Sequence, residues 1–291
     1  MEYLGFGFTK SFYGLFLHLI RQILFDCCYQ MWYHFNSNVF HSITVEVSMD
    51  VTQIKFIIFD VGQTLLFLTP PSEEVLLARC QQLAIDVELE DLKRGCKVGE
   101  LWVAQTIMQE QRGAPRMSDA EFDMRWEYVV LEEALKDRKE NIEDLVNKLR
   151  NINCPAQNWS APSETYTVLD ELQAKGLPLG IVSNFPKTLS DLCRQVGIAD
   201  YFDFIIASEE VGISKPDPRI LRMALRRAQV KPNEAVYVGD HPFDILCAKK
   251  VPMPIIWFNK DDDPLPDGFA FCPDLQIGNL LELTKIIPNV K

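Results

Sequence analysis

Polar residues that can do chemistry follow several short apolar runs of this sequence. A carboxylate can attack an electrophile or ligate a divalent cation, an ammonium group neutralises an anion, and a hydroxyl donates a hydrogen bond to one. Residues that end parallel strands gather at one edge of a sheet, where ligands bind. The candidates are Asp60 after Phe56–Phe59, Ser183 after Leu179–Val182, Lys215 in the loop 212–218, and Asp240 and Asp244 after Val236–Gly239.

Each candidate also has an ordinary structural explanation. Asp60 suits a turn or a helix N-cap, Ser183 suits a turn, and Lys215 suits the surface. Asp240 and Asp244 suit a helix cap and a first helical turn. Taken singly, each of these explanations is the better one. Taken together they require a coincidence at several strand ends, so the pattern favours one shared polar site.

The elements that must position these residues alternate between strands and helices. Apolar, β-branched runs are typical of strands that are covered on both faces. Amphipathic segments that end at Gly176 and Gly197 are typical of helices with glycine C-caps. This alternation predicts a parallel, doubly wound sheet. We expect strands at 54–59, 177–182, 204–207, 235–238 and 254–258, and helices at 163–175, 187–196, 217–229, 243–250 and 276–287.

The stretch between the first strand and residue 150 carries helical signals only. Helices are expected from Ser72, over about 88–111, from Ser118 and over 139–150, and Ser118 stands at capping-box spacing from Glu121. No strand pattern interrupts them, so this stretch predicts a small helical bundle. Residues 151–162 are expected to connect it back to the sheet.

The ordered set of these motifs resembles the haloacid dehalogenase (HAD) superfamily over about residues 54–288. The resemblance implies an α/β fold, a Rossmann-like three-layer αβα core with a parallel sheet and an inserted helical-bundle cap. On that basis, residues 49–69 and 156–291 form the core and residues 70–155 form the cap. A cap of this kind closes over small substrates, which implies a small phosphorylated metabolite as the substrate.

The resemblance also implies a role for each residue in a Mg²⁺-dependent phosphatase. Asp60 would attack phosphorus and form an aspartyl-phosphate, which splits hydrolysis into two easier steps. Lys215 would neutralise Asp60 and the phosphoryl group, while Ser183 and the backbone N–H of Asn184 would bind phosphate oxygens. The Mg²⁺ ligands would be Asp60, Asp240, the backbone carbonyl of Gly62, and Asp244 directly or through water.

One position departs from the pattern of the family's phosphatases. They usually carry a second Asp two residues after the nucleophile, as a general acid and base, and here Gly62 stands there. General acid–base catalysis is typically worth about 10²–10⁴-fold in rate. His241 is the only histidine outside the first 48 residues and is expected first as a helix-start residue and second as a substitute acid–base group.

Two other functions compete with phosphatase activity. The dehalogenases of the family also lack the second Asp, but they work without a metal and lose the acidic pair that Asp240 and Asp244 keep here. A HAD domain with a binding or regulatory role would keep Mg²⁺ and phosphate binding without turnover. The substrate itself and the oligomeric state are not readable from the residues.

Composition narrows the class of protein further. The 291 residues carry 29 Lys and Arg against 41 Asp and Glu, and a net charge of −12 argues against nucleic-acid binding. The eight cysteines form no CxxC pair and no Cys/His cluster of zinc spacing. They predict reduced core thiols in a cytoplasmic protein.

Residues 1–48 differ from the rest, because they hold 12 of the 31 aromatic residues and three of the four histidines. The uncharged run between Lys10 and Arg21 is short for a membrane span, and no small-residue cleavage site for a signal peptide follows it. An amphipathic surface helix would bring membrane contact. The favoured interpretation is an extension outside the functional domain, with Met49 as the start of the functional chain.

Overall fold

The computed structural model describes residues 49–111, 114–115, 117–152, 157–265, 269 and 271–289. Met49–Lys291 forms one compact unit. The predictions for residues 1–48 lie outside the described residues. Among the helices that are described, none is both long and apolar enough to cross a membrane.

A six-stranded parallel sheet forms the centre of the unit, as the sequence predicts, with the order β5-β4-β1-β6-β7-β8. Apolar side chains fill both of its faces, and β1, β4, β6 and β7 are buried at every position. Such strands need cover on both sides. The strands are β1 (Phe56–Phe59), β4 (Leu179–Ser183), β5 (Phe204–Ala207), β6 (Ala235–Gly239), β7 (Ile255–Phe258) and β8 (Leu275–Ile277).

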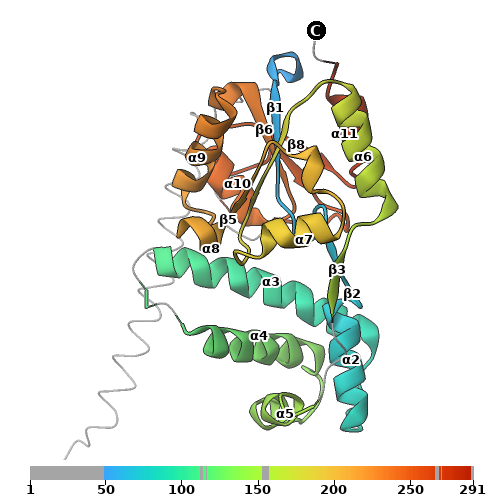
Figure 1. Ribbon diagram of the computed structural model, residues 1–291. Helices are drawn as coiled ribbons and strands as arrows, with labels where there is room; N and C mark the ends of the chain where they lie inside the picture. Colours follow the sequence, from blue (N-terminus) through green and yellow to red (C-terminus); the bar gives the residue numbers. More distant parts are fainter. Residues whose placement is uncertain are drawn as a thin grey trace, which may run out of the picture. The chain divides into compact units, whose positions relative to one another are not determined.

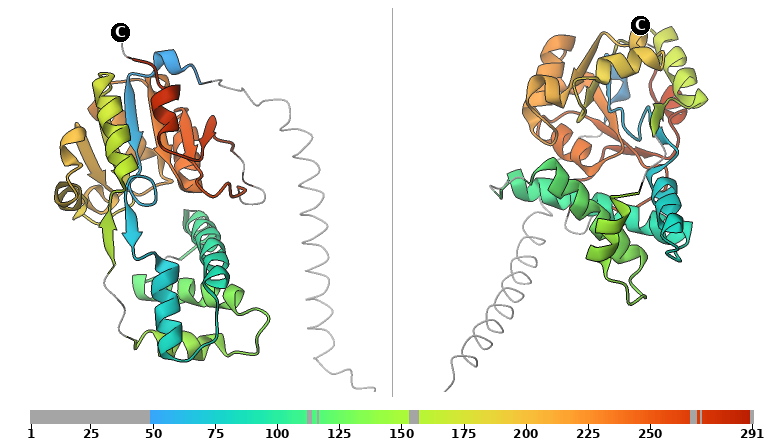
Figure 2. Two further views of the ribbon diagram at one scale, coloured as in Figure 1. Left: turned by 90° about the vertical axis from the view of Figure 1, so that its right-hand side faces the viewer. Right: turned by 60° about the horizontal axis from the view of Figure 1, so that its bottom comes forward.

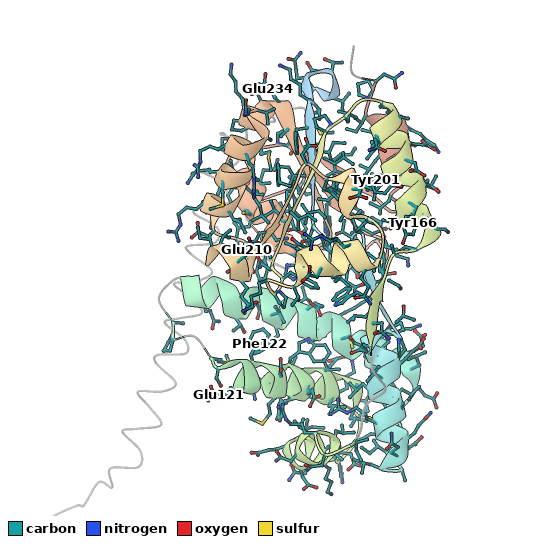
Figure 3. The ribbon with its side chains drawn as sticks, in the orientation of Figure 1. Glu121, Phe122, Tyr166, Tyr201, Glu210 and Glu234 are labelled. Carbon is teal, nitrogen blue, oxygen red and sulfur yellow. The ribbon has the colours of Figure 1, made fainter. Side chains whose placement is uncertain are left out.

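Helices cover the sheet on both faces and complete three layers (Figure 1). One face packs against α6 (Ser163–Ala174), α7 (Leu189–Gln195) and α11 (Glu282–Ile286). The other packs against α9 (Pro218–Ala228) and α10 (Pro242–Lys249). Tyr166 and Tyr201, both labelled in Figure 3, donate hydrogen bonds to Val196 O and Asp170 Oδ1. The short elements are η1 (Val51–Gln53), η2 (Ala199–Tyr201), α8 (Ser208–Val211) and η3 (Pro232–Glu234).

Four helices share a separate apolar core. They are α2 (Ser72–Gln82), α3 (Leu89–Gln111), α4 (Asp119–Ala134) and α5 (Ile142–Leu149). The predicted capping box at Ser118 is present, because its hydroxyl accepts the Glu121 N–H and the Glu121 carboxylate accepts the Ser118 N–H. Trp102 of α3 packs against Phe122 of α4 with ring centroids 5.0 Å apart, and Figure 3 labels Phe122.

A two-stranded antiparallel ribbon joins these helices to the sheet, and the sequence patterns did not predict it. It consists of β2 (Phe67–Thr69), just before α2, and β3 (Asn158–Ser160), just before α6. Figure 2 shows both strands running between the sheet and the four helices. Leu68 pairs with Trp159 across the ribbon. Both chain crossings therefore run side by side.

The predicted helix at 276–287 is wrong in its first half. Residues 275–277 form β8, which pairs with β7 in parallel register, and the helix α11 is limited to Glu282–Ile286. The exposed edge of β7 supplies backbone partners for this strand, and that tertiary pairing outweighs a local helical pattern. Asp274 fixes the approach by accepting the Ile255 N–H at 2.8 Å.

The prediction of core thiols is correct for part of the described cysteines. Cys80, Cys193 and Cys247 are buried, Cys96 is half-buried and Cys272 is exposed, all of them free thiols. The remaining three cysteines, at 27, 28 and 154, lie outside the described residues.

Candidate active site

The structure brings the predicted polar residues together at the carboxyl edge of the sheet. Asp60 follows β1, Ser183 ends β4 and Asp240 follows β6. Lys215 Nζ donates to Asp60 Oδ1 at 2.7 Å and to Asp244 Oδ1 at 2.6 Å. Asp60, Ser183, Lys215 and Asp244 are buried, with 7%, 2%, 2% and 0% of their surface exposed. Lys215 is therefore not a surface lysine, because its ammonium group is buried in ion pairs with two carboxylates.

Three carboxylates of the cluster converge on one small volume. One ligand oxygen each from Asp60, Asp240 and Asp244 lies within 4.8 Å of the others. Thr64 Oγ1 donates to Asp240 Oδ1 at 2.8 Å, and the His241 N–H donates to Asp244 Oδ2 at 3.0 Å. These bonds fix the orientation of two of the three carboxylates. The oxygen-rich donor set fits a hard divalent cation such as Mg²⁺.

Among the described residues, Lys215 is the one lysine paired with this cluster of three carboxylates, so the charges of the cluster are not balanced. Burial raises the pKa of Asp240 well above its usual range, and the nearby Asp60 and Asp244 raise it further. Burial raises the pKa of Asp244 to about 6, although the Lys215 ammonium opposes this. Burial opposes the ammonium form of Lys215, but Asp244 and Asp60 raise its pKa above the usual value. A bound divalent cation would relieve this excess of negative charge.

Tyr237, a buried residue in the middle of β6, also belongs to the site, although the sequence pattern did not predict it. Its hydroxyl donates to Val182 O at 2.6 Å and accepts from Lys215 Nζ at 2.9 Å. Burial raises the pKa of Tyr237 well above its usual value, so the hydroxyl stays protonated. Tyr237 therefore holds the lysine between the two carboxylates. One feature of the sequence could have indicated this role, namely a tyrosine inside an otherwise apolar strand, because a buried tyrosine hydroxyl needs a hydrogen-bond partner.

Asn184 has a structural role beyond the predicted one. Its side-chain Nδ2 donates to Lys215 O at 2.9 Å, and its Oδ1 accepts the Lys215 N–H at 2.7 Å. This pair of bonds ties the loop after β4 to the loop that carries Lys215. Spacing along the chain gives no signal for such a contact, because the two residues are separated by 31 positions.

Gly62 lies near the edge of an aromatic side chain. A Cβ atom built on Gly62 would lie 3.5 Å from Cη2 and 3.9 Å from Cζ3 of Trp159, the outer edge of the indole. Trp159 belongs to the ribbon strand β3 and packs against Phe185 with ring centroids 5.4 Å apart. The position of the family's usual second Asp is therefore bordered by the Trp159 indole, which itself packs against Phe185.

His241 is the helix-start residue that the sequence predicts. It is the N-cap of α10, where its Nδ1 accepts the Phe243 N–H at 3.2 Å. Burial lowers the pKa of His241 to about 4, and the Lys215 ammonium contributes in the same direction. A neutral ring whose Nδ1 is an acceptor for the backbone is poorly suited to deliver a proton from that nitrogen at neutral pH.

Comparisons with known proteins agree with this geometry. A family model described as haloacid dehalogenase-like hydrolase matches residues 107–258, just over half of the chain, and the match includes Ser183, Lys215, Asp240 and Asp244. The haloacid dehalogenase-like hydrolase domain-containing protein 3 of Danio rerio is 38% identical over 100 residues, which is 34% of this chain and 41% of the relative. The phosphoserine phosphatase of Thermus thermophilus is 37% identical over 125 residues, 41% of this chain and 48% of that enzyme.

The matched segments span 41%, 33% and 46% of the length of the first three curated relatives. Among solved structures, the HAD-hydrolase YfnB of Bacillus subtilis, which was solved bound to magnesium, aligns with a TM-score of 0.56 and 20% identity. The alignment covers 80% of this chain and 98% of YfnB, and it shows a shared fold. The chain belongs to the haloacid dehalogenase-like hydrolase family.

Proposed function

We propose that this protein is a phosphatase that hydrolyses a small phosphate monoester through attack by Asp60. The observation that carries the proposal is the buried contact of Asp60 with Lys215, within reach of Asp240 and Asp244. Phosphoryl transfer needs a positioned nucleophile and strong neutralisation of the phosphoryl charge, and this cluster offers both. The phosphatase names of relatives such as the Thermus enzyme support the same activity.

Each residue has one task in this proposal. An Asp60 oxygen forms a bond to phosphorus while the ester oxygen leaves, and water then hydrolyses the aspartyl-phosphate. Lys215 neutralises the approaching anions, and the Ser183 hydroxyl with the Asn184 N–H binds phosphate oxygens. Tyr237 keeps Lys215 in place through its 2.9 Å hydrogen bond.

Asp60, Asp240 and Asp244, together with the backbone carbonyl of Gly62, would hold Mg²⁺. The fit rests on the convergence of the three carboxylates and on the charge imbalance of the cluster. The ion would supply positive charge where the nucleophile and the phosphoryl group, both anionic, have to meet. The presence of Asp240 and Asp244 also argues against dehalogenation, which needs no metal.

Proton transfer is the weak point of this site. Gly62 provides no acid, and the backbone hydrogen bond of His241 makes it a poor replacement. We therefore expect rates that are low for substrates whose leaving group needs a proton, by about 10²–10⁴-fold compared with a complete site. The same observation favours the second candidate function, a domain that binds Mg²⁺ and phosphate without turnover.

The test is phosphate release by the full chain from a panel of small phosphate esters. We expect turnover that requires Mg²⁺ and disappears in Asp60→Asn, an almost isosteric change that removes the nucleophile. Asp191→Asn is the matched control, because Asp191 is an exposed residue of α7 that pairs with Arg194. It should keep full activity.

Absence of turnover in a folded wild type that still binds Mg²⁺ and phosphate by calorimetry would favour the binding domain. Turnover that survives in Asp60→Asn would refute the role of Asp60. Turnover that survives a chelator would refute the role of the metal.

A further inference from the structure

An aromatic pair lies beside the candidate site, and its Trp159 member is the one near Gly62. A Cβ built on Gly62, two residues after Asp60, would lie 3.5 Å from the edge of the Trp159 indole. Phe185 stands two residues after Ser183, and its ring meets the indole at 60° with centroids 5.4 Å apart. The two rings therefore lie next to the two loops that carry the nucleophile and the phosphate-binding serine.

Both rings are held in place and partly accessible. Each is half-buried and packs against the core cluster on the α6 face of the sheet. Strand pairing with Leu68 fixes the backbone of Trp159. The backbone of Phe185 is fixed by its N–H, which donates to Ser208 Oγ at 3.2 Å. Rings that are fixed in this way can bind a planar group with little loss of side-chain entropy.

The chemistry at Gly62 selects for the same kind of group. With no side-chain acid there, the leaving oxygen departs with the bonding electron pair and takes its proton from water. Phenols, with a pKa near that of tyrosine at about 10, leave as anions far more readily than aliphatic alcohols. The two features are independent of each other, and both favour an aromatic leaving group.

We propose that Trp159 and Phe185 select the substrate, and that the preferred substrates are phosphate monoesters of aromatic alcohols. This inference rests on the proposed phosphatase function. Asp60 forms a bond to phosphorus, the bond between phosphorus and the aryl oxygen breaks, and the phenolate takes a proton from water. Water then hydrolyses the aspartyl-phosphate and releases phosphate. The aryl ring packs on the indole and on Phe185 throughout.

The first experiment compares kcat/KM for phenyl phosphate and ethyl phosphate in the full chain. We expect a preference for phenyl phosphate of at least about 100-fold in the wild type. In Trp159→Leu the part of this preference that comes from ring packing should disappear, a reduction of roughly 10-fold. Trp159→Phe keeps a ring and should restore most of it, which separates ring packing from a folding defect.

The matched control is Trp102→Leu, which removes an indole from a similar aromatic pair, Trp102 of α3 and Phe122 of α4. It should leave the preference for phenyl phosphate unchanged. An equal preference in Trp159→Leu and in the wild type, or a wild type without any preference, overturns the proposal.

The second experiment measures binding without turnover. In Asp60→Asn with Mg²⁺, phenylphosphonate should bind more tightly than methylphosphonate by calorimetry, and Trp159→Leu in this background should remove the difference. Equal affinities for the two phosphonates overturn the inference. If phenylphosphonate is preferred but no ester is hydrolysed by the wild type, the phosphatase proposal fails while the aromatic selection stands.

Discussion

Replacing Lys215 by methionine should destabilise the protein strongly when no metal is bound. The lysine is 2% exposed and donates to Asp60, Asp244 and Tyr237 at 2.7, 2.6 and 2.9 Å. Methionine has a similar length but no charge, so the buried Asp60 and Asp244 lose the ammonium that pairs with both of them. Removing one partner of a buried ion pair costs about 3–5 kcal/mol. For a chain of this size that corresponds to a loss of roughly 6–20 °C in melting temperature.

The pH dependence of this loss has a definite sign. Burial already raises the pKa of Asp244 to about 6, above the unfolded value of 3.8, and losing the ammonium raises it further. The folded variant therefore takes up protons that the unfolded chain does not, and it regains stability as the pH falls from about 7.5 to about 5. His241, whose pKa burial lowers to about 4, works in the opposite direction. Because the Lys215 ammonium contributes to that lowering, its loss weakens the opposing effect of His241, which adds to the carboxylate effect in the variant.

The assay is urea unfolding with a chelator present, at both pH values, with Lys97→Met as the matched control. Lys97 pairs with Asp263 at 2.7 Å, but its side chain is 49% exposed, so the control should lose less than about 1 kcal/mol. A loss below about 1 kcal/mol for Lys215→Met, or a loss of equal size at both pH values, would refute the view that this cluster is an unbalanced buried charge.

Two further changes test other parts of the structure. Thr64→Val keeps the side-chain shape but removes the 2.8 Å hydrogen bond to Asp240, so the affinity for Mg²⁺ should fall about 10-fold by calorimetry, and an unchanged affinity would show that the bond does not orient the carboxylate. Gly180→Ala places a Cβ 2.4 Å from Cζ of Phe204, so it should cost about 1–3 kcal/mol in urea unfolding, with partial recovery when combined with Phe204→Leu. Additive losses in that double variant would contradict the clash.

The sheet was predictable because its strands are buried on both faces. A strand such as Phe56–Phe59 is apolar at every position, and such a continuous apolar run in the sequence is typical of a strand covered on both faces. The edge strand β8 was not predictable, since residues 275–277 become a strand only by pairing with β7. The ribbon strands β2 and β3 have three residues each, too few for any periodicity.

The candidate site divides in the same way. Asp60, Ser183 and Asp240 were predictable because the ends of parallel strands meet at one edge. The proximity of Trp159 to Gly62 was not predictable, because the two residues are 97 positions apart and the ribbon brings them together. Thr64 and Tyr237 carry single hydroxyls with no motif around them, and their roles depend on partners that are distant in the sequence.

The ribbon has a mechanical consequence for the site. Its two strands are the crossings that precede α2 and α6, and they are hydrogen-bonded to each other, so neither can bend without the other. Trp159 belongs to one of these strands, and its indole edge lies near Gly62. A swing of the helices α2–α5 that bends the ribbon at the Leu68–Trp159 pair would therefore move the indole relative to the nucleophile loop. The Trp159 side chain thus couples the position of the helices α2–α5 to the surroundings of Gly62, two residues after Asp60.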